Sequence, residues 1–512
     1  MDLLRGGGRL REARPSRECQ RPGSVGRQPA GSAAVLTAVC LGLMLSAFNS
    51  TLVNVMLPDI RVALHASPTG LQWVAALYTL CYGALLLAGG ALGERIGKRM
   101  AFLGGVAVFT VGSAACAAAP ALGLLLAARA VQAAGVAVML PQTLSILVTE
   151  YTDQARRARA VGIWAGVASL GLAVGPVVGG VITSLASWRA GFLLSVVLGV
   201  ITLALGFRVL SRARYGRPAH APAPDFAGAA LSTLALAALV YGLIESATLG
   251  WGSPLIIGAF VVAAAAAAAF LVAQRAASVR GGHPLMPLEF WRSRGFIGAN
   301  LAGLAYFFTL FGILYFYSID LQQYGHYSTL AAGLTFLPMT VLMAVFGPVA
   351  GRLTARFTAT PVMVAGLLVA AAGSLSLALL PADGSVADVG WRFALVGIGA
   401  GLMSSPMSNT AVSSVAARHS TAASATHNTF RQIGGTLGVA ALGAIVTAGQ
   451  HATGGATAAF GTGLSHAMTV VAAVLVICAA VVAVLGDRRS PARKNVRDQQ
   501  TPGHLVSNPN DL

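Results

Sequence analysis

The sequence predicts an all-α polytopic membrane protein with 14 transmembrane helices, built as two six-helix repeats plus an inserted helix pair, with both termini cytoplasmic. Three observations support this fold class. Apolar residues make up 56% of the 512 residues and charged residues only 10%, whereas soluble domains carry about 25% charged residues. Apolar runs close to the roughly 20 residues that span a bilayer recur along the chain. Basic residues gather in every second connection between those runs.

Each apolar run predicts one membrane-crossing helix. The first six runs cover residues 34–57, 70–92, 101–119, 121–148, 160–183 and 190–210. The other eight cover residues 226–244, 254–273, 296–318, 330–350, 361–380, 391–415, 429–449 and 464–486. The predicted domains are a disordered cytoplasmic tail (1–33), an N-terminal six-helix bundle (34–210), a cytoplasmic linker (211–225), the inserted helix pair (226–273), a second cytoplasmic linker (274–295), a C-terminal six-helix bundle (296–486) and a cytoplasmic tail (487–512).

The distribution of Lys and Arg predicts the orientation of the chain. With the N-terminus inside, 30 of the 34 basic residues fall in segments on the cytoplasmic side, as the positive-inside rule requires. The exceptions are Arg61, Arg129, Arg189 and Arg392. The net charge of +18 is therefore a signal of topology, and nucleic-acid binding is not needed to explain it.

Catalytic and metal-binding patterns are missing from the sequence. The five cysteines, an odd number, lie mostly inside apolar runs and form neither a disulfide framework nor a metal-ligand spacing. We find no nucleophile and base pair and no phosphate-binding loop. His419 and His427 lie near a predicted inside loop, where we expect them to be solvated. An enzyme, a cofactor and a metal site are therefore not expected.

Two predicted inside loops share a short pattern of Gly, Leu and Arg. The loop after the second helix reads GALGERIGKR from Gly90, and the loop after the tenth reads GRLTARFTAT from Gly351. Both place Leu two residues after Gly and Arg three residues after Leu. If the two loops correspond, helices one to six repeat as nine to fourteen. Repeats of this kind surround a central cavity in many secondary transporters.

Several segments resemble one transporter family. GALGERIGKR resembles the signature loop between helices two and three of the major facilitator superfamily, RAVQAAG (from Arg129) its helix-four motif, and GLAVGPVVGG (from Gly171) its helix-five antiporter motif. STLVNVMLPDI, LQWVAALY and NTFRQIGGTLGVA resemble its fourteen-helix drug:proton antiporter branch, the EmrB/QacA-like multidrug-resistance transporters. The resemblance covers nearly all of residues 34–486. It implies export of small molecules in exchange for protons, without a cofactor.

The resemblance implies conformational roles for helix five and for the first inside loop. Gly171, Gly175 and Gly179 recur every four residues, which lets a neighbouring helix approach closely, and Pro176 removes a helix hydrogen bond. Tight packing alone is the alternative, whereas the family motif implies a role in holding one transport state. In the loop, the family places an aspartate latch at the position of Glu94, followed here by Arg95.

The neighbouring basic residues Lys98 and Arg99 have a simpler explanation. We expect them to be solvated charges that set the topology.

Arg129 and Asn49 are the polar residues that we expect deepest in the N-terminal bundle. Arg129 lies about 12 Å into helix four at 1.5 Å per residue, and an intramembrane charge is a functional candidate by default. Snorkelling to the outer interface is the alternative. Asn49 lies about 22 Å up helix one, so the two side chains share a depth. The family places an aspartate at the Asn49 position, and an amide cannot carry its proton.

The distribution of acids predicts the charge of the substrate. All 16 acids lie in tails, loops or helix ends, so no deep carboxylate can pair with a cationic drug. We therefore expect a neutral or weakly anionic, hydrophobic substrate, with Arg129 able to attract a phenolate or carboxylate. Candidate cavity residues are Asn54, Trp73, Tyr78, Tyr82, Gln132, Gln142, Trp164, Asn300, Tyr306, Asn428, Arg431 and Gln432. For each of them, hydrogen bonding between helices or anchoring at the membrane interface is the favoured alternative. Arg431, at the predicted inner start of helix thirteen, is equally explained as a topology charge.

Together these observations predict a secondary transporter in the bacterial cytoplasmic membrane that exports hydrophobic small molecules against proton re-entry. The abundant Ala, Gly and Arg fit a GC-rich bacterial genome. A facilitative or uptake transporter of the same fold is an alternative, which the asparagine at position 49 favours and the helix-five motif disfavours. A non-transporting membrane sensor is a more distant alternative, since the tails are too short and polar for a signalling domain. The expected partners are the bilayer, the substrate and protons.

Overall fold

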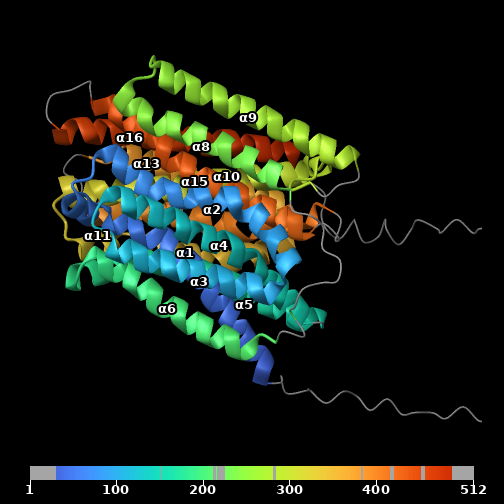
Figure 1. Ribbon diagram of the computed structural model, residues 1–512. Coiled ribbons are helices and arrows are strands. Elements are labelled where there is room, and N and C mark those ends of the chain that lie inside the picture. The colour runs from blue at the N-terminus through green and yellow to red at the C-terminus, as the bar shows by residue number, and fades with distance from the viewer. Residues whose placement is uncertain are drawn as a thin grey trace, which may run out of the picture.

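The computed structural model is helical throughout the parts of the chain that it describes, residues 30–151, 153–211, 215, 225–280, 284–381, 385–415, 420–450 and 456–486. The first bundle consists of α1 (Ala30–Leu64), α2 (Pro68–Ile96), α3 (Lys98–Ala118), α4 (Leu122–Glu150), α5 (Gln154–Leu185) and α6 (Trp188–Val209). The pair α8 (Phe226–Leu249) and α9 (Pro254–Val279) follows. The second bundle consists of α10 (Arg294–Ile319), α11 (Thr329–Thr335), α12 (Leu337–Phe357), α13 (Ala359–Ala378), α14 (Val386–Ser413), α15 (Ser420–Gln450) and α16 (Ala456–Leu485), with short helices η1 (Leu288–Arg292) and η2 (Asp320–Tyr324) beside α10. Figure 1 shows them as one bundle of roughly aligned rods.

The prediction of fourteen membrane-crossing helices is confirmed. The described residues contain 14 helices that are long and apolar enough to cross a membrane, with α11 and α12 counted as one span. Most of these helices are longer than the apolar runs, because polar residues continue them beyond the hydrocarbon-length core. The largest difference is in α15, which begins at Ser420 rather than at 429. Arg431 therefore lies about 16 Å along α15 at 1.5 Å per residue, and its predicted place at the start of a helix is wrong.

The second bundle repeats the packing of the first. In the first bundle α1 packs on α5, α2 on α4, and α3 on both α4 and α6. In the second bundle α10 packs on α15, α12 on α14, and α13 on both α14 and α16. The pairs are the same when α10 is matched to α1, α12 to α2, α13 to α3, α14 to α4, α15 to α5 and α16 to α6. The inserted pair α8 and α9 stands outside this scheme.

The two loops that share the Gly, Leu and Arg pattern also share a backbone conformation. Gly97 separates α2 from α3 with φ 94° and ψ 143°, and Thr358 separates α12 from α13 with φ 77° and ψ 167°. This region is open to glycine and costs about 1–3 kcal/mol for a residue with a side chain. Thr358 therefore holds a strained conformation that its counterpart Gly97 adopts freely.

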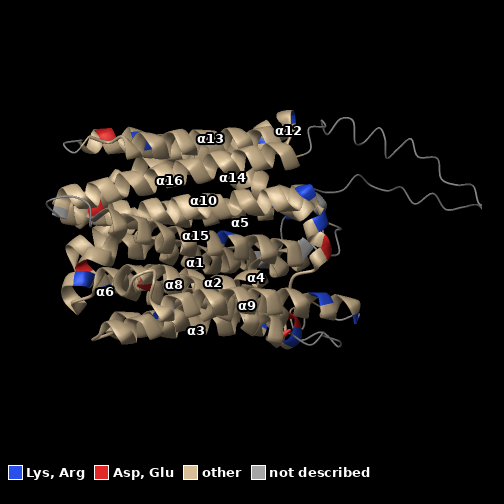
Figure 2. Ribbon diagram, turned by 90° about the horizontal axis from the view of Figure 1, so that it is seen from above, with Lys and Arg blue, Asp and Glu red and all other residues tan. Residues whose placement is uncertain are grey.

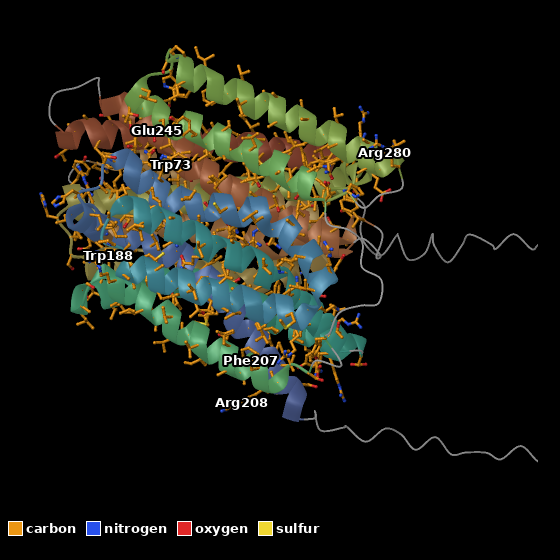
Figure 3. All side chains as sticks on the ribbon, in the orientation of Figure 1. Trp73, Trp188, Phe207, Arg208, Glu245 and Arg280 are labelled. Atoms are coloured by element: carbon orange, nitrogen blue, oxygen red, sulfur yellow. The ribbon has the colours of Figure 1, made fainter. Side chains whose placement is uncertain are left out.

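The inserted pair lies at the edge of the bundle. α8 packs against α9, α2 and α15, while α9 forms the outermost rod in Figure 1. Trp73 on α2 donates from Nε1 to Glu245 Oε1 on α8 at 2.8 Å, and Figure 3 shows these two side chains close together. The carboxylate of Glu245 thus holds the inserted pair against the first bundle.

Basic residues gather at one end of the bundle, as Figure 2 shows. We call this the basic end; it carries Arg95, Lys98, Arg99, Arg156, Arg157, Arg208, Arg275, Arg280, Arg292, Arg294, Arg352 and Arg356. The opposite end carries Arg61, Arg189 and Arg392. The predicted tails lie largely outside the described residues, as do most of the 211–225 linker and His419.

Candidate functional site

A cavity of about 620 Å³ lies between the two bundles. Helices α1, α2, α4 and α5 form one wall, and α10, α12, α14 and α15 form the other. Its polar and aromatic lining comprises Ser46, Ser50, Tyr82, Trp164, Ser169, Tyr306, Phe307, Ser404, Ser405, Ser408, Asn409, Asn428, Arg431 and Gln432. Among the described residues, no Asp or Glu lines this cavity. Arg431 is its one charged lining residue within that part of the chain.

The cavity extends toward the basic end. Gly162, in the third turn of α5, and Asn409, in the last two turns of α14, both belong to its wall. The opposite end is closed by contacts between the bundles. Ser318 Oγ donates to the main-chain oxygen of Asn54 at 2.7 Å, and Gln322 Nε2 donates to that of Val55 at 3.0 Å. Access to the cavity is therefore from the basic end.

Helix α5 lies unusually close to α1. A methyl group on Gly175 would meet Thr51 Oγ1 at 2.0 Å, and Gly171 and Gly179 also face α1. Thr51 Oγ1 in turn donates to the main-chain oxygen of Leu172 at 3.1 Å. The glycines at four-residue spacing are thus where the two backbones approach, as the sequence predicts.

Helix α5 also contacts the second bundle, at the closed end opposite the basic end. A methyl group on Gly180 would meet the Thr329 carbonyl oxygen at 2.8 Å, and one on Gly333 would meet the Pro176 carbonyl oxygen at 2.7 Å. Thr329 Oγ1 also donates to Asp59 Oδ2 at 3.1 Å. The family motif therefore joins α1 within its own bundle to α11 of the other bundle.

Arg129 and Asn49 form the centre of a buried polar cluster. Arg129 Nη1 donates to Asn49 Oδ1 at 2.6 Å and to Gln132 Oε1 at 2.9 Å. Its Nε donates to the Val74 carbonyl oxygen at 3.3 Å, and its Cζ lies 4.3 Å from the centre of the Tyr78 ring. Every one of these partners is electrically neutral, so hydrogen bonds and the aromatic face stabilise the cation in place of a carboxylate.

The polar cluster is sealed from the cavity. Arg129 is 1% exposed and Asn49 is 0% exposed. Two serines complete the cluster: Ser113 accepts from Gln132, and Ser195 accepts from Asn49. The expected shared depth of Asn49 and Arg129 agrees with this direct contact. The expectation that Arg129 attracts an anionic substrate does not fit the geometry, because its Nη1 and Nε already donate to protein oxygens and the residue does not line the cavity.

The first inside loop differs in part from the expectation. Glu94 and Arg95 are exposed at the basic end. Lys98 is partly buried and Arg99 is buried, so the interpretation of both as solvated charges is wrong for Arg99 and only partly right for Lys98. Lys98 Nζ donates to Thr149 Oγ1 at 2.7 Å, and Arg99, 7% exposed, donates from Nε to a carbonyl oxygen after α6 at 2.6 Å. Both basic side chains donate hydrogen bonds to acceptors at helix ends.

The structure divides the other predicted cavity residues into two groups. Tyr82, Trp164, Tyr306, Asn428 and Gln432 line the cavity. The remaining ones do not line it. The side chains of Trp73, Tyr78, Gln132 and Gln142 contact neighbouring helices. Asn54 accepts from Ser318 through its main-chain oxygen, and the side chain of Asn300 donates within α10. These helices are buried on several sides, so their sequences contain no amphipathic stripe that indicates the cavity face.

Sequence reasoning underestimated two features. Arg431 lines the cavity, which favours its interpretation as a cavity residue over the equally weighted alternative of a topology charge. His427 is buried rather than solvated, at 3% exposed. The serines and Asn409 of α14 were missed, although the polar run SSPMSN inside a predicted apolar helix was a usable signal.

The match to known proteins agrees with this architecture. A sequence profile of the Major Facilitator Superfamily matches residues 39–439. The chain belongs to the major facilitator superfamily. A solved structure of a bacterial homologue of the human lysosomal transporter Spinster, inward-facing and unoccupied, superposes with a TM-score of 0.63 over 93% of this chain and 100% of that one, at 19% identity. That likeness concerns the fold of the superfamily.

Sequence relatives in the superfamily are closer. The methylenomycin A resistance protein of Streptomyces coelicolor is 34% identical over 82% of this chain and 87% of its own length. The cephamycin export protein of Amycolatopsis lactamdurans is 36% identical over 80% of this chain and 83% of its own. The protein is thus a multi-pass transporter of the superfamily with relatives in antibiotic resistance and export.

Proposed function

We propose that the protein exports hydrophobic, neutral or weakly anionic small molecules of the antibiotic type from the bacterial cytoplasm. The observation that carries this proposal is the cavity of about 620 Å³, with aromatic and small polar lining and no acid among the described residues. Such a lining suits broad recognition of apolar ligands, and a cation without a carboxylate partner would be costly there. The resistance and export proteins among the relatives support the direction of transport.

Alternating access follows from how the two bundles meet. We place the basic end in the cytoplasm by the positive-inside rule, so the structure is the inward-facing state. Opening the other end requires separation of α1 and α5 from α10 and α11, which are joined by the contacts around Asn54 and Gly180. In the outward-facing state, the exposed Glu94 would latch the loop at the closed cytoplasmic side, with Arg95 beside it.

Proton coupling is the second part of the proposal. Asn49 cannot carry the proton, so another acid must do so if protons drive export. Asp59 and Asp320 lie toward the closed end, where external protons arrive, and Asp59 is already part of the closure through Thr329. Glu94 and Glu245 are the other two acids to be tested as proton carriers. A facilitator without coupling is the second candidate, favoured by the amide at position 49.

Everted membrane vesicles separate these two mechanisms. An acidic interior is imposed, and proton release is followed as neutral, anionic and cationic drugs are added to the parent and to Asn49→Asp. Release by the parent with neutral or anionic compounds supports antiport, and amide variants of the four acids then locate the carrier. Release by Asn49→Asp alone makes the parent a facilitator. A permanent quaternary cation that outcompetes neutral compounds would contradict the proposed substrate class.

A further inference from the structure

Arg431 is a charged residue whose hydrogen-bonding capacity is largely unused. Its Nη1 donates to Asn428 Oδ1 at 3.2 Å, and its Cζ lies 4.3 Å from the centre of the Phe307 ring. Its Nε is buried without a partner. A guanidinium has five N–H donors, so most of them are free of described protein partners and the group belongs to the cavity wall.

The positive charge of Arg431 is also uncompensated. No described Asp or Glu lines the cavity, and Arg431 forms no ion pair with the described residues. The contrast with Arg129 is direct, because there the same group is enclosed by Asn49, Gln132 and a main-chain oxygen. Arg431 is partly buried, and a cation with unmet donors in a largely apolar cavity is unfavourable unless a partner supplies charge and acceptors.

The residues around Arg431 suit a ligand that has an apolar or aromatic body and an anionic end. Gln432 is 5% exposed, belongs to the cavity wall, and its Oε1 has no partner. Tyr82 on α2 and Tyr306 on α10 present phenol rings to the same cavity. An aromatic or apolar body fits between these rings, and a planar oxyanion matches the fork of a guanidinium.

We propose that Arg431 is the substrate-anchoring residue, and that it binds the carboxylate or phenolate of hydrophobic weak organic acids. This inference rests on the proposed export function and narrows its substrate class. The ligand supplies the counter-charge that the described protein groups lack. Asn428, which already bonds to Arg431, orients the guanidinium as a positioning residue.

A matched pair of probes tests the inference on the full chain in lipid nanodiscs at pH 7.5. Equilibrium dialysis measures the Kd of anthracene-9-carboxylate and of its uncharged carboxamide, with empty nanodiscs subtracted. We expect the parent to bind the carboxylate about 10- to 100-fold more tightly, the range of one charge-assisted hydrogen bond. Arg431→Gln should lose this preference and leave carboxamide binding unchanged. Arg431→Lys should keep part of the preference, because it keeps the charge.

Arg280→Gln is the control variant, since Arg280 is exposed at the end of α9 (Figure 3) and does not line the cavity. It should bind both probes as the parent does. Equal Kd values for the two probes in the parent, or a preference that survives in Arg431→Gln, would overturn the inference. So would an equal loss of both probes in Arg431→Gln and Arg431→Lys, which indicates a packing role, or failure of the parent to bind either probe.

Export assays test the proposed export function separately from the anchoring role of Arg431. Cells that lack their own pumps are loaded with the carboxylate, with the carboxamide or with neutral antibiotics, and retention of each is compared with and without the protein. Export of neutral compounds without any preference for the carboxylate would refute the anchoring role alone. Absence of export for every compound would refute the proposed function itself.

Discussion

Replacement of Gly175 by alanine tests the close approach of α5 to α1. The added methyl group would lie 2.0 Å from Thr51 Oγ1 and 3.0 Å from the Phe48 carbonyl oxygen. The first contact is a side chain that can rotate, but the second is backbone, so rotation of Thr51 relieves only part of the overlap. Gly175→Ala must therefore separate the two helices or displace Thr51 from its bond to Leu172.

The expected cost of this substitution combines three effects. Overpacking of a well-filled contact costs about 1–3 kcal/mol. Loss of the hydrogen bond from Thr51 to the Leu172 carbonyl oxygen adds about 1 kcal/mol. The better helix propensity of alanine returns about 1 kcal/mol. We therefore expect Gly175→Ala to lower the free energy of unfolding by about 2 kcal/mol.

The assay is reversible unfolding of the purified protein in mixed SDS micelles, run as a double-mutant cycle with Thr51→Ala. Removing the Thr51 hydroxyl removes the closest contact, so Gly175→Ala should cost less in that background, with a coupling of about 1–2 kcal/mol. Gly166→Ala is the control on the same helix, because no atom lies within 4 Å of a methyl group there. It should be as stable as the parent or more so.

Two results would refute this reasoning. If Gly175→Ala is as stable as Gly166→Ala, the helices are not in the contact that the structure describes. If the cost is large but independent of Thr51, the overlap is not with that hydroxyl. Where the prediction holds, drug retention in cells should rise for Gly175→Ala, because the same helix also forms the closed end of the transporter.

Three further substitutions test other contacts. Asn49→Leu removes an acceptor from the buried Arg129, so the free energy of unfolding in mixed micelles should fall by about 2 kcal/mol. Asn49→Asp keeps an acceptor and should not show this loss. Equal losses in the two variants would contradict the hydrogen bond between Asn49 and Arg129. Thr358→Gly relieves the φ of 77° and should stabilise the protein by about 1 kcal/mol in the same assay, and a loss would show that no strain is held there. Trp73→Phe removes the donor to Glu245 and should cost about 1.5–3 kcal/mol. If the bond is the cause, the same change should add no cost in a Glu245→Leu background, which lacks the acceptor.

The number of helices, the basic end and the internal repeat could be predicted from the sequence. Each rests on a local property of the chain, because the transfer of a residue into hydrocarbon and the pairing of its backbone within a helix do not depend on distant neighbours. The glycine spacing of α5 likewise predicted a close helix contact, since only absent side chains permit one. The shared depth of Asn49 and Arg129 followed from the pitch of two helices, whereas their direct hydrogen bond is known only from the structure.

The face that each helix turns to the cavity was decided by tertiary structure. Arg129 and Arg431 are both arginines within apolar helices, yet one is enclosed by neutral partners and the other lies in the cavity wall. Helices buried on several sides carry no hydrophobic stripe, so rotation about the helix axis is set by packing against neighbours that are remote in sequence. The polar start of α15 shows the same limit, because residues 420–428 carry no apolar run that would predict the beginning of the helix at Ser420.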